Sequence, residues 1–199
     1  MDSRVMYQIS YGLYVLTAKE GGKDNGCIVN TVTQVTSSPN RITVAVNKQN
    51  YTHDMILRSG MFNVSVLAQS APFDLFRNFG YQSGLTADKF QQVPFVRMNN
   101  GIARLSEHAT ACFSGRVVSA TDLGTHTLFL ADVTDGELLC DEEPVTYAYY
   151  QKNIKPAPAP TKKTGWRCRI CGYIYEGETL PPDFVCPVCK HGAEDFEKL

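Results

Sequence analysis

Four cysteines near the C-terminal end constrain this chain more than any other feature. They form two C-x-x-C pairs, Cys168 with Cys171 and Cys186 with Cys189, and fourteen residues separate the pairs. Each pair can turn back on itself and direct two thiolates at one point, so that two pairs build a closed tetrahedral sulfur site. Such a site suits zinc, which would be structural, or a single iron, which would carry one electron.

The composition excludes several classes of protein. The chain has 199 residues, is 43% hydrophobic and has a formal net charge of −1. It can therefore form a proper core, and it has no overall basic field that would attract nucleic acid or an anionic membrane. The first residues do not form a cationic segment followed by a long apolar one, and no run approaches the roughly 20 apolar residues of a membrane span. We expect a cytoplasmic protein that binds neither nucleic acid nor a membrane.

The other three cysteines do not have ligand spacing. Cys27, Cys112 and Cys140 lie far apart, inside or beside apolar stretches. Free cysteines are among the most often buried residues, and a disulfide framework would require an oxidising compartment. We expect all three to be small buried side chains.

A change in composition divides the chain into three parts. Residues 151–164, QKNIKPAPAPTKKT, contain alternating proline and alanine, four lysines and one large apolar side chain, Ile154. Such a segment is expected to be a flexible, semi-extended and exposed linker. We therefore predict one domain over residues 1–150 and a small domain over residues 165–199, which could move relative to the first or reach a neighbouring subunit.

The first domain is predicted to be mainly β. Apolar and polar residues alternate at 42–46 and 62–66, as in half-buried strands, and residues 27–36 are rich in β-branched side chains. Further strands are expected at 11–17, 109–120 and 125–133, with a hairpin signal in EGGKDNG that includes Asn25-Gly26. Many short strands favour a closed or partly closed antiparallel barrel, and no G-x-G-x-x-G follows a strand, which argues against a Rossmann domain.

Two short helices interrupt the predicted strands. One is expected at about 52–59 with Thr52 as its candidate cap. The other is expected at about 71–79, where Ser70 precedes Pro72 near the first helical turn.

The C-terminal segment contains more than the cysteine spacing. Gly172 suits a turn whose backbone amides point at sulfur, and five aromatic residues between 166 and 196 can form a miniature core. The patterns W-x-C-x-x-C-G-Y-x-Y, C-P-x-C and A-x-x-x-F-E resemble the shortened rubredoxin domain at the end of rubrerythrins. The resemblance implies one iron ion held as Fe(Cys)4; the alternative is a structural zinc ribbon. Lys190 and His191 stand where ordinary rubredoxins have glycine, which leaves the reduction potential open.

Segments of the first domain also resemble a known family. They are VNTVTQVTSSP at 29–39 followed by ITVAVNKQNYTH, FGYQSGLTADKF at 79–90, and LGTHTLFLADV at 123–133. In this order they resemble the strands and loop of the flavin reductase-like split-barrel family. The resemblance implies a split β-barrel that binds FMN, accepts electrons from NAD(P)H and forms a homodimer with the flavin near the interface.

Site residues follow from this resemblance by position. The residues implied to line the isoalloxazine are Asn30, Thr31, Thr33, Gln34, Val35 and Thr36. Those implied to hold the ribityl-phosphate end are Asn47, Lys48, Tyr51 and Thr52, with Ser83 and Lys89 closing over the phosphate. His126 would lie near the reactive face of the flavin as the catalytic residue, although Thr125 stands where the family often has Asp. The alternatives are ordinary strand threonines, solvated surface lysines and a plain strand histidine.

Together the two domains resemble high-molecular-weight rubredoxins. This implies electron transfer from NAD(P)H through bound FMN to one iron, and then to a partner such as a flavodiiron-type oxygen or nitric oxide reductase. The nicotinamide could donate directly or through a separate reductase. One alternative is a flavin reductase that releases free reduced flavin and has a zinc ribbon for stability. The other is a non-enzymatic metal-binding or docking protein with an empty barrel.

Overall fold

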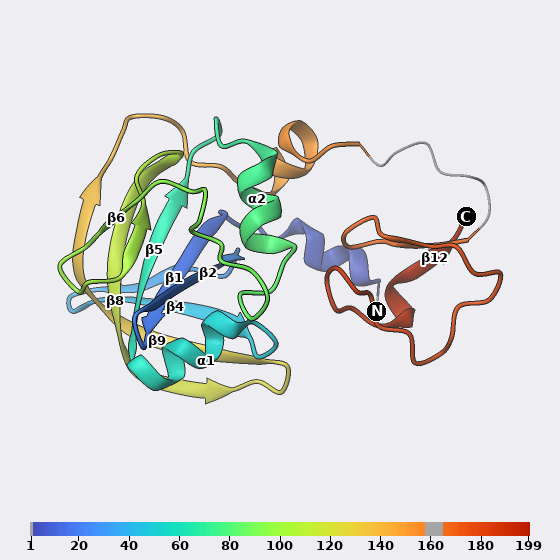
Figure 1. The fold of residues 1–199 in the computed structure, drawn as a ribbon, viewed down its shortest axis with the longest axis horizontal. Helices are drawn as coiled ribbons and strands as arrows, with labels where there is room; N and C mark the ends of the chain where they lie inside the picture. The colour runs from blue at the N-terminus through green and yellow to red at the C-terminus, as the bar shows by residue number, and fades with distance from the viewer. Residues whose placement is uncertain (1, 158–164) are drawn as a thin grey trace. The chain divides into compact units, whose positions relative to one another are not determined.

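Two compact units make up the chain in a computed structural model, which describes residues 2–157 and 165–199 (Figure 1). The larger unit is Met1–Lys155 and the smaller one is Pro156–Leu199. Half of the predicted linker, residues 158–164, lies outside the described residues.

A seven-stranded antiparallel sheet forms the larger unit, in the order β2-β1-β5-β8-β9-β4-β3 (Figure 1). The strands are β1 Tyr14–Glu20, β2 Lys23–Val29, β3 Thr33–Ser37, β4 Asn40–Asn47, β5 Met61–Leu67, β8 Ala109–Asp122 and β9 His126–Leu138. One core cluster joins residues from β2, near one edge of the sheet, with residues from β4, near the other. The sheet therefore curls round a shared core, which confirms the predicted mainly-β, partly closed barrel.

The hairpin between β1 and β2 turns at Gly21-Gly22. Glu20 pairs with Lys23, and both glycines have positive φ, of +55° and +82°. A two-residue turn with two left-handed residues matches the twist of the paired strands. The Asn25-Gly26 pair, which we included in the hairpin signal, instead lies within β2.

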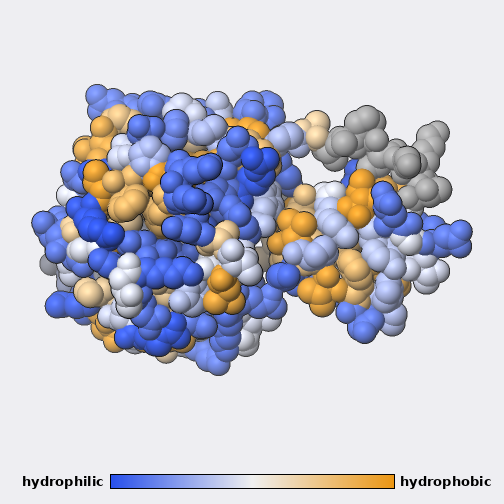
Figure 2. Space-filling view, viewed as in Figure 1, coloured by the Kyte–Doolittle hydropathy of each residue, from blue (hydrophilic) through white to orange (hydrophobic). Residues whose placement is uncertain are grey.

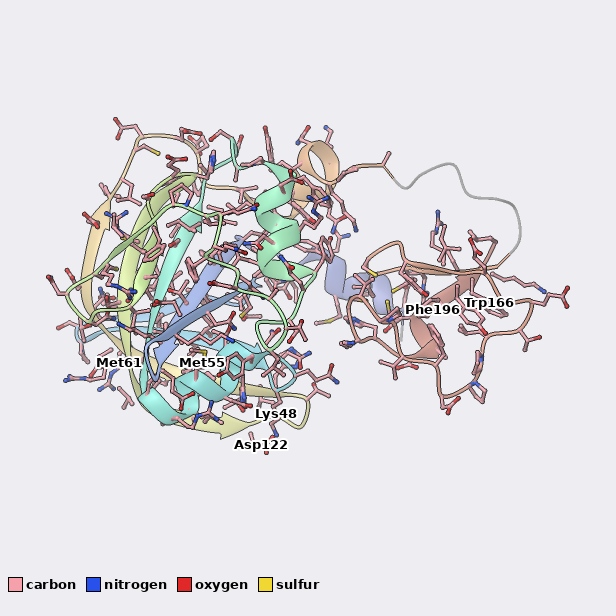
Figure 3. All side chains as sticks on the ribbon, viewed as in Figure 1. Lys48, Met55, Met61, Asp122, Trp166 and Phe196 are labelled. Atoms are coloured by element: carbon pink, nitrogen blue, oxygen red, sulfur yellow. The ribbon has the colours of Figure 1, made fainter. Side chains whose placement is uncertain are left out.

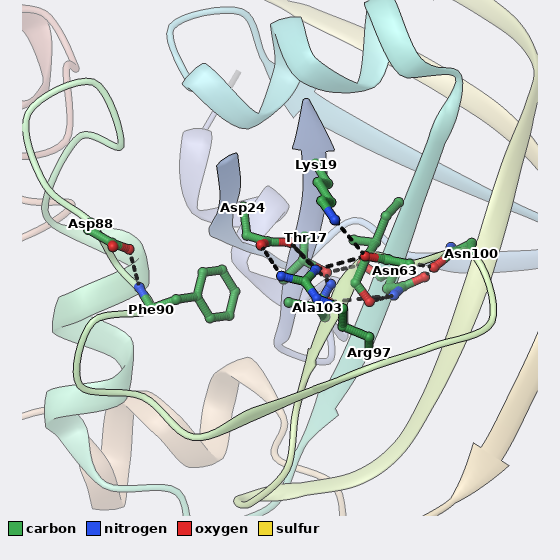
Figure 4. A network of polar contacts seen from close by, with 11 residues as sticks. Thr17, Lys19, Asp24, Asn63, Asp88, Phe90, Arg97, Asn100 and Ala103 are labelled. Atoms are coloured by element: carbon green, nitrogen blue, oxygen red, sulfur yellow. Dashed lines mark hydrogen bonds and ion pairs between the residues drawn. The ribbon is translucent and has the colours of Figure 1, made fainter. Parts of the chain in front are cut away.

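A small hairpin covers the outer face of β5 and is fastened to it by polar contacts (Figure 4). It consists of β6 Phe95–Arg97 and β7 Ala103–Leu105. Asn63 of β5 is fully buried and donates from Nδ2 to the carbonyl of Ile102 at 2.9 Å. Thr17 of β1 donates to the carbonyl of Ala103 at 2.6 Å. Consequently β5 is buried on both faces, although its alternating sequence predicted only one buried face.

Helices α1 Tyr51–Ser59 and α2 Phe73–Gly80 confirm the two predicted helices. The N-cap of α1 is Asn50, and Thr52 lies within the first turn with a fully buried side chain, so Thr52 is not the cap. The helix ends at Ser59 and is capped by Gly60, whose φ of +68° is the left-handed conformation that favours glycine at this position.

The chain after the sheet stays folded for longer than the composition suggested. A short helix α3 Tyr147–Tyr149 continues into a π-helical turn at Tyr150–Ile154. Tyr150 is buried with its ring 4.6 Å from that of Phe76, and Ile154 packs against the same cluster. The prediction of an extended linker from residue 151 is therefore wrong for residues 151–154, because the backbone there is helical and Ile154 packs on the barrel.

The smaller unit contains a three-stranded sheet in the order β11-β10-β12. Its strands are β10 Trp166–Cys168, β11 Ile174–Tyr175 and β12 Phe196–Lys198, and 3-10 helices lie at Ala193–Asp195 here and at Ser3–Gln8 in the larger unit. Phe184 lies at the centre of an aromatic cluster, with ring centroids 4.7 Å from Tyr175 and 5.3 Å from Phe196. The predicted aromatic core is thus present beside the cysteines.

The exposed residues of the larger unit include one of its three cysteines. On the face shown in Figure 2, apolar areas of the larger unit are broken up by polar and charged ones. Among the helices of the described residues, none is long and apolar enough to cross a membrane. Cys27 and Cys112 are buried as expected, but Cys140 is exposed, because it follows β9 in a loop.

A candidate metal cage and a candidate flavin site

The four cysteines of the smaller unit converge on one point. Their sulfur atoms all lie within 4.8 Å of one another, and the Cys168–Cys189 and Cys171–Cys186 pairs are each 3.5 Å apart. A tetrahedral ion with metal–sulfur bonds of about 2.3 Å requires sulfur atoms about 3.8 Å apart. The four sulfurs therefore fit a single tetrathiolate-bound ion, which confirms that the two C-x-x-C pairs share one site.

The first metal-binding loop, or knuckle, spans residues 168–173. The Cys168 amide donates to the carbonyl of Tyr173 at 2.8 Å, and the Gly172 amide donates to the carbonyl of Cys168 at 2.9 Å. Gly172 has φ of +79°. This left-handed residue turns the next amide, that of Tyr173, toward the sulfur of Cys171, where it lowers the thiol's pKa.

The second knuckle, residues 186–191, repeats the same pattern. The Cys186 amide donates to the carbonyl of His191 at 2.8 Å, and the Lys190 amide donates to the carbonyl of Cys186 at 2.9 Å. The His191 amide in turn hydrogen-bonds to the sulfur of Cys189. The two knuckles thus present their sulfurs in the same way, as two C-x-x-C turns of one site should. His191 itself is exposed at the surface.

The sulfurs differ in acidity even without an ion. A hydrogen bond from Cys189 lowers the pKa of Cys171 to about 5, and the Tyr173 amide adds to this effect. The pKa of Cys189, which keeps the shared proton, is raised, and burial raises that of Cys168. Binding of an ion to the four sulfurs must displace the protons that they carry.

Most of the residues predicted to contact the flavin lie in one row, here called the track, which runs from edge strand β3 along β4 to the start of helix α1. Edge strand β3 pairs with β4 through Thr33 and Thr43, and Thr31 donates to the carbonyl of Ala45 at 2.7 Å. Asn30 is partly buried in the bend before β3. The β3 residues predicted to contact the flavin are all exposed, namely Thr33, Gln34, Val35 and Thr36. This edge strand is therefore open to a ligand or to a second subunit.

The charged end of the track lies where β4 meets helix α1. Asn47 ends β4, Lys48 follows it, and Tyr51 begins the helix. No side chain caps the first turn of α1 among the described residues. A helix N-terminus without a side-chain cap and with a nearby lysine suits an anionic group such as a phosphate.

An acidic partner already contacts this lysine. Lys48 Nζ lies 2.6 Å from Oδ1 of Asp122, and Figure 3 shows the two side chains next to each other. Lys48 and then the Gly124 amide lower the pKa of Asp122. Sequence reasoning did not identify Asp122, because position 122 at the end of β8 reaches position 48 only through the pairing of β9 with both β8 and β4.

His126 lies beside the charged end of the track. It pairs with Asn47 across the β4–β9 ladder, and its Nδ1 is 2.9 Å from Oγ1 of Thr125. Thr43 is the β4 residue that pairs with Thr33 of β3, and Asn47 lies four residues further along β4. At about 3.4 Å per residue, His126 therefore lies about 14 Å along the sheet from the Thr33–Thr43 pair. The register therefore brings His126 nearer to the predicted phosphate end than to β3.

The loop at residues 79–90 is anchored against β2. Gly84 packs directly on the Asn25 side chain, and Lys23 Nζ donates to the Gly84 carbonyl at 2.7 Å. Ser83 is exposed, and its hydroxyl accepts a hydrogen bond from the Leu85 amide. Asn25 also donates to Oγ1 of Thr52 at 3.0 Å, so this one side chain contacts both the loop and the start of α1.

Two predicted phosphate contacts are not available at the surface. Lys89 is only 3% exposed, and its Nζ donates to the carbonyls of Gly26 at 2.9 Å and Phe79 at 3.1 Å. Thr52 is fully buried, and its hydroxyl is engaged by Asn25. Placing these two side chains on the phosphate was therefore wrong, because both are used inside the protein to fasten the loop and α1.

A buried histidine on α1 was not predicted as a site residue. His53 Nδ1 lies 2.8 Å from Oδ1 of Asp54, and Nε2 lies 2.8 Å from Oγ1 of Thr127. This bridge fastens α1 to β9 beside Lys48 and His126. Nothing in the spacing of residues 53 and 127 indicates it, because it depends on the sheet pairing.

Comparisons with known proteins identify both units. A model of the flavin reductase-like domain matches residues 6–158, and a model of the rubrerythrin, rubredoxin-like domain matches residues 166–197. The chain is 36% identical to a high molecular weight rubredoxin from Moorella thermoacetica over the full length of both proteins. It is also 41% identical to a ferric-chelate reductase (NAD(P)H) from Archaeoglobus fulgidus, over 75% of this chain and 89% of that protein.

A solved structure supports the same fold. An NADH:FAD oxidoreductase from Streptomyces globisporus C-1027, in complex with NAD and FAD fragments, matches with a TM-score of 0.66. The identity is 23%, and the match covers 79% of this chain and 92% of that one. Both resemblances found in the sequence are thereby confirmed. The chain belongs to the flavin reductase-like family and carries a rubredoxin-like domain of the rubrerythrin type after its barrel.

Proposed function

We propose that this protein passes electrons from NAD(P)H through a bound FMN to a single iron held by Cys168, Cys171, Cys186 and Cys189. From the iron they would pass to a partner such as a flavodiiron-type oxygen or nitric oxide reductase. The protein is an NAD(P)H-dependent oxidoreductase of a flavin family with a four-cysteine iron site. The proposal adds the identity of the flavin, the direction of electron flow and the acceptor.

One observation carries the proposal. The same chain combines a flavin reductase-like barrel with a sulfur cage of the size for one ion. A flavin accepts a hydride and returns electrons one at a time, which is the conversion that joins a nicotinamide to a one-electron centre. A structural zinc ion would leave the attached cage without a redox role.

The barrel residues have separate tasks in this proposal. The exposed strand β3, with Asn30 and Thr31 before it, would lie against the ring system. Asn47, Lys48, Tyr51 and the first-turn amides of α1 would bind the phosphate, and Ser83 would approach from the loop. His126, beside Asn47, would orient the nicotinamide or the ribityl chain, and hydride transfer depends mainly on such positioning.

A homodimer is part of the proposal. The whole of β3 is an exposed edge strand, and Leu138 at the end of β9 is 85% exposed. An edge strand presents unpaired backbone groups that can pair with another chain. Light scattering coupled to size-exclusion chromatography should give the mass of two chains, and a single-chain mass would contradict this part.

Lys48 and Asp122 should have opposite effects on flavin binding. Lys48→Ala is expected to weaken FMN binding about tenfold or more, because a charge-assisted contact to the phosphate is lost. Asp122→Asn should strengthen it a few-fold, because Lys48 is released from its carboxylate. Fluorescence titration of the flavin-free protein measures both constants. Riboflavin, which has no phosphate, is the control ligand, and an equal loss of riboflavin affinity in Lys48→Ala would contradict the phosphate assignment.

The visible spectrum and metal content of the purified protein test the whole proposal. We expect flavin bands, the absorption of a ferric tetrathiolate, and one iron per chain. Addition of NAD(P)H should bleach both sets of bands, the flavin first. One zinc per chain without the ferric absorption would instead support a flavin reductase with a structural zinc ribbon.

A further inference from the structure

Lys190 adopts a backbone conformation that the matching position of the other knuckle gives to glycine. Its φ is +64°, whereas Gly172 at the equivalent position has φ of +79°. Both residues donate their amides to the carbonyl of the first cysteine in their pair. A lysine in the left-handed region is strained by about 1 kcal/mol relative to glycine. Strain of this kind is kept where the surrounding structure or the function requires it.

Packing does not account for the choice of lysine. The Lys190 side chain is exposed, and within the part of the chain that the structure describes it forms no ion pair. The two other cations next to a ligand, Arg167 and Arg169, lie on either side of Cys168 and are different. Arg167 forms an ion pair with Glu197. The Arg169 guanidinium donates to the Glu194 carbonyl at 2.8 Å and lies 3.9 Å from the carboxylate of Asp195. Of these three cations in the described residues, only Lys190 has a charge that no carboxylate offsets.

The position of this charge has an electrostatic consequence. Lys190 directly follows Cys189, which is one of the two partly exposed ligands. Four thiolates give a net charge of −1 with ferric iron and −2 with ferrous iron. A fixed positive charge nearby favours the more negative state, and the charge around such a centre is one determinant of its potential.

We propose that Lys190 sets the reduction potential of the sulfur cage, raising it so that the reduced iron is favoured. This inference rests on the proposed function, because the charge matters to the ion only if the ion changes its oxidation state. The strained turn keeps the His191 amide on the sulfur of Cys189, and the side chain adds a positive charge that glycine could not supply.

Potentiometric titration of the full-length, iron-loaded protein tests the inference. In Lys190→Gln and Lys190→Gly the ferrous-to-ferric ratio at a fixed ambient potential should fall about three- to tenfold, and Lys190→Arg should stay at the wild-type value. Arg169→Gln is the matched control, with a smaller change because Asp195 already offsets its charge. The difference between wild type and Lys190→Gln should shrink in high salt.

The outcomes separate this inference from the proposed function. Wild-type protein without ferric tetrathiolate absorption would overturn both. A normal ferric band with the same potential in Lys190→Gln as in wild type would overturn only the role of Lys190. A shift in Lys190→Gly that is absent from Lys190→Gln would also overturn it, because the backbone conformation and not the charge would then set the potential.

Discussion

Replacing Cys171 by serine is expected to abolish electron delivery to an external acceptor while NAD(P)H still reduces the bound flavin. The hydroxyl of serine is a poor replacement for a thiolate, and Cys171 is one of the four sulfurs that converge on the site. The larger unit contains none of the four ligands, so its flavin site should be unaffected. Stopped-flow absorbance with NADH and NADPH in turn follows the flavin and the iron separately.

Cys140→Ser is the matched control for this experiment. Cys140 is exposed in the larger unit and lies outside the cage, so its replacement should leave both steps at wild-type rates. If Cys171→Ser also stopped flavin reduction, the two units would not act as separable modules. If it left delivery to the acceptor intact, the iron would not be on the electron path.

Lys89→Met should destabilise the barrel by about 2 kcal/mol or more, because two buried carbonyls lose their partner. The ammonium of Lys89 joins the carbonyl of Phe79, in the last turn of α2, to that of Gly26 in β2. Burial lowers the pKa of Lys89 below its ordinary value, so the folded state binds this proton less tightly than the unfolded state. Stability linked to Lys89 should therefore rise with pH between its folded pKa and about 10.4, and the Met variant should lose this dependence.

Urea unfolding of the flavin-free protein measures this effect, with Lys152→Met as the control. Lys152 is exposed in the turn after α3 and should change the free energy of unfolding little. The sequence resemblance placed Lys89 on the phosphate, which predicts the reverse result. An unchanged stability of the flavin-free protein with a large loss of FMN affinity would favour that earlier assignment over the structure.

Local sequence patterns predicted correctly those features that depend on contacts between residues close together in the chain. The alternation in 42–46 predicted β4, because its apolar side chains face the core with period two. The C-x-x-C spacing predicted the metal ligands, because each pair closes its own turn within six residues. The order of weak motifs along the barrel was enough to identify the family, since a fold fixes the order of its strands.

Contacts between distant segments could not be predicted in the same way. Lys89 and Thr52 occur in motifs that match the family, but a motif does not tell which way a side chain points. Asp122 of β8 reaches Lys48, and Thr127 of β9 reaches His53, only through the pairing of β9 with β8 and β4. The docking of Tyr150 against Phe76 likewise overrides the linker-like composition that follows it.

The matched knuckles also bear on how the small unit folds. Each knuckle closes its backbone hydrogen bonds between residues no more than five apart, whereas β10 and β12 join residues 166–168 to 196–198. Contacts that are close in sequence form quickly, and those that close long loops form slowly. The two knuckles, each of which holds two of the four sulfurs, are therefore expected to form early. The slow step in folding of the small unit should be the pairing of β10 with β12, which brings the two knuckles together.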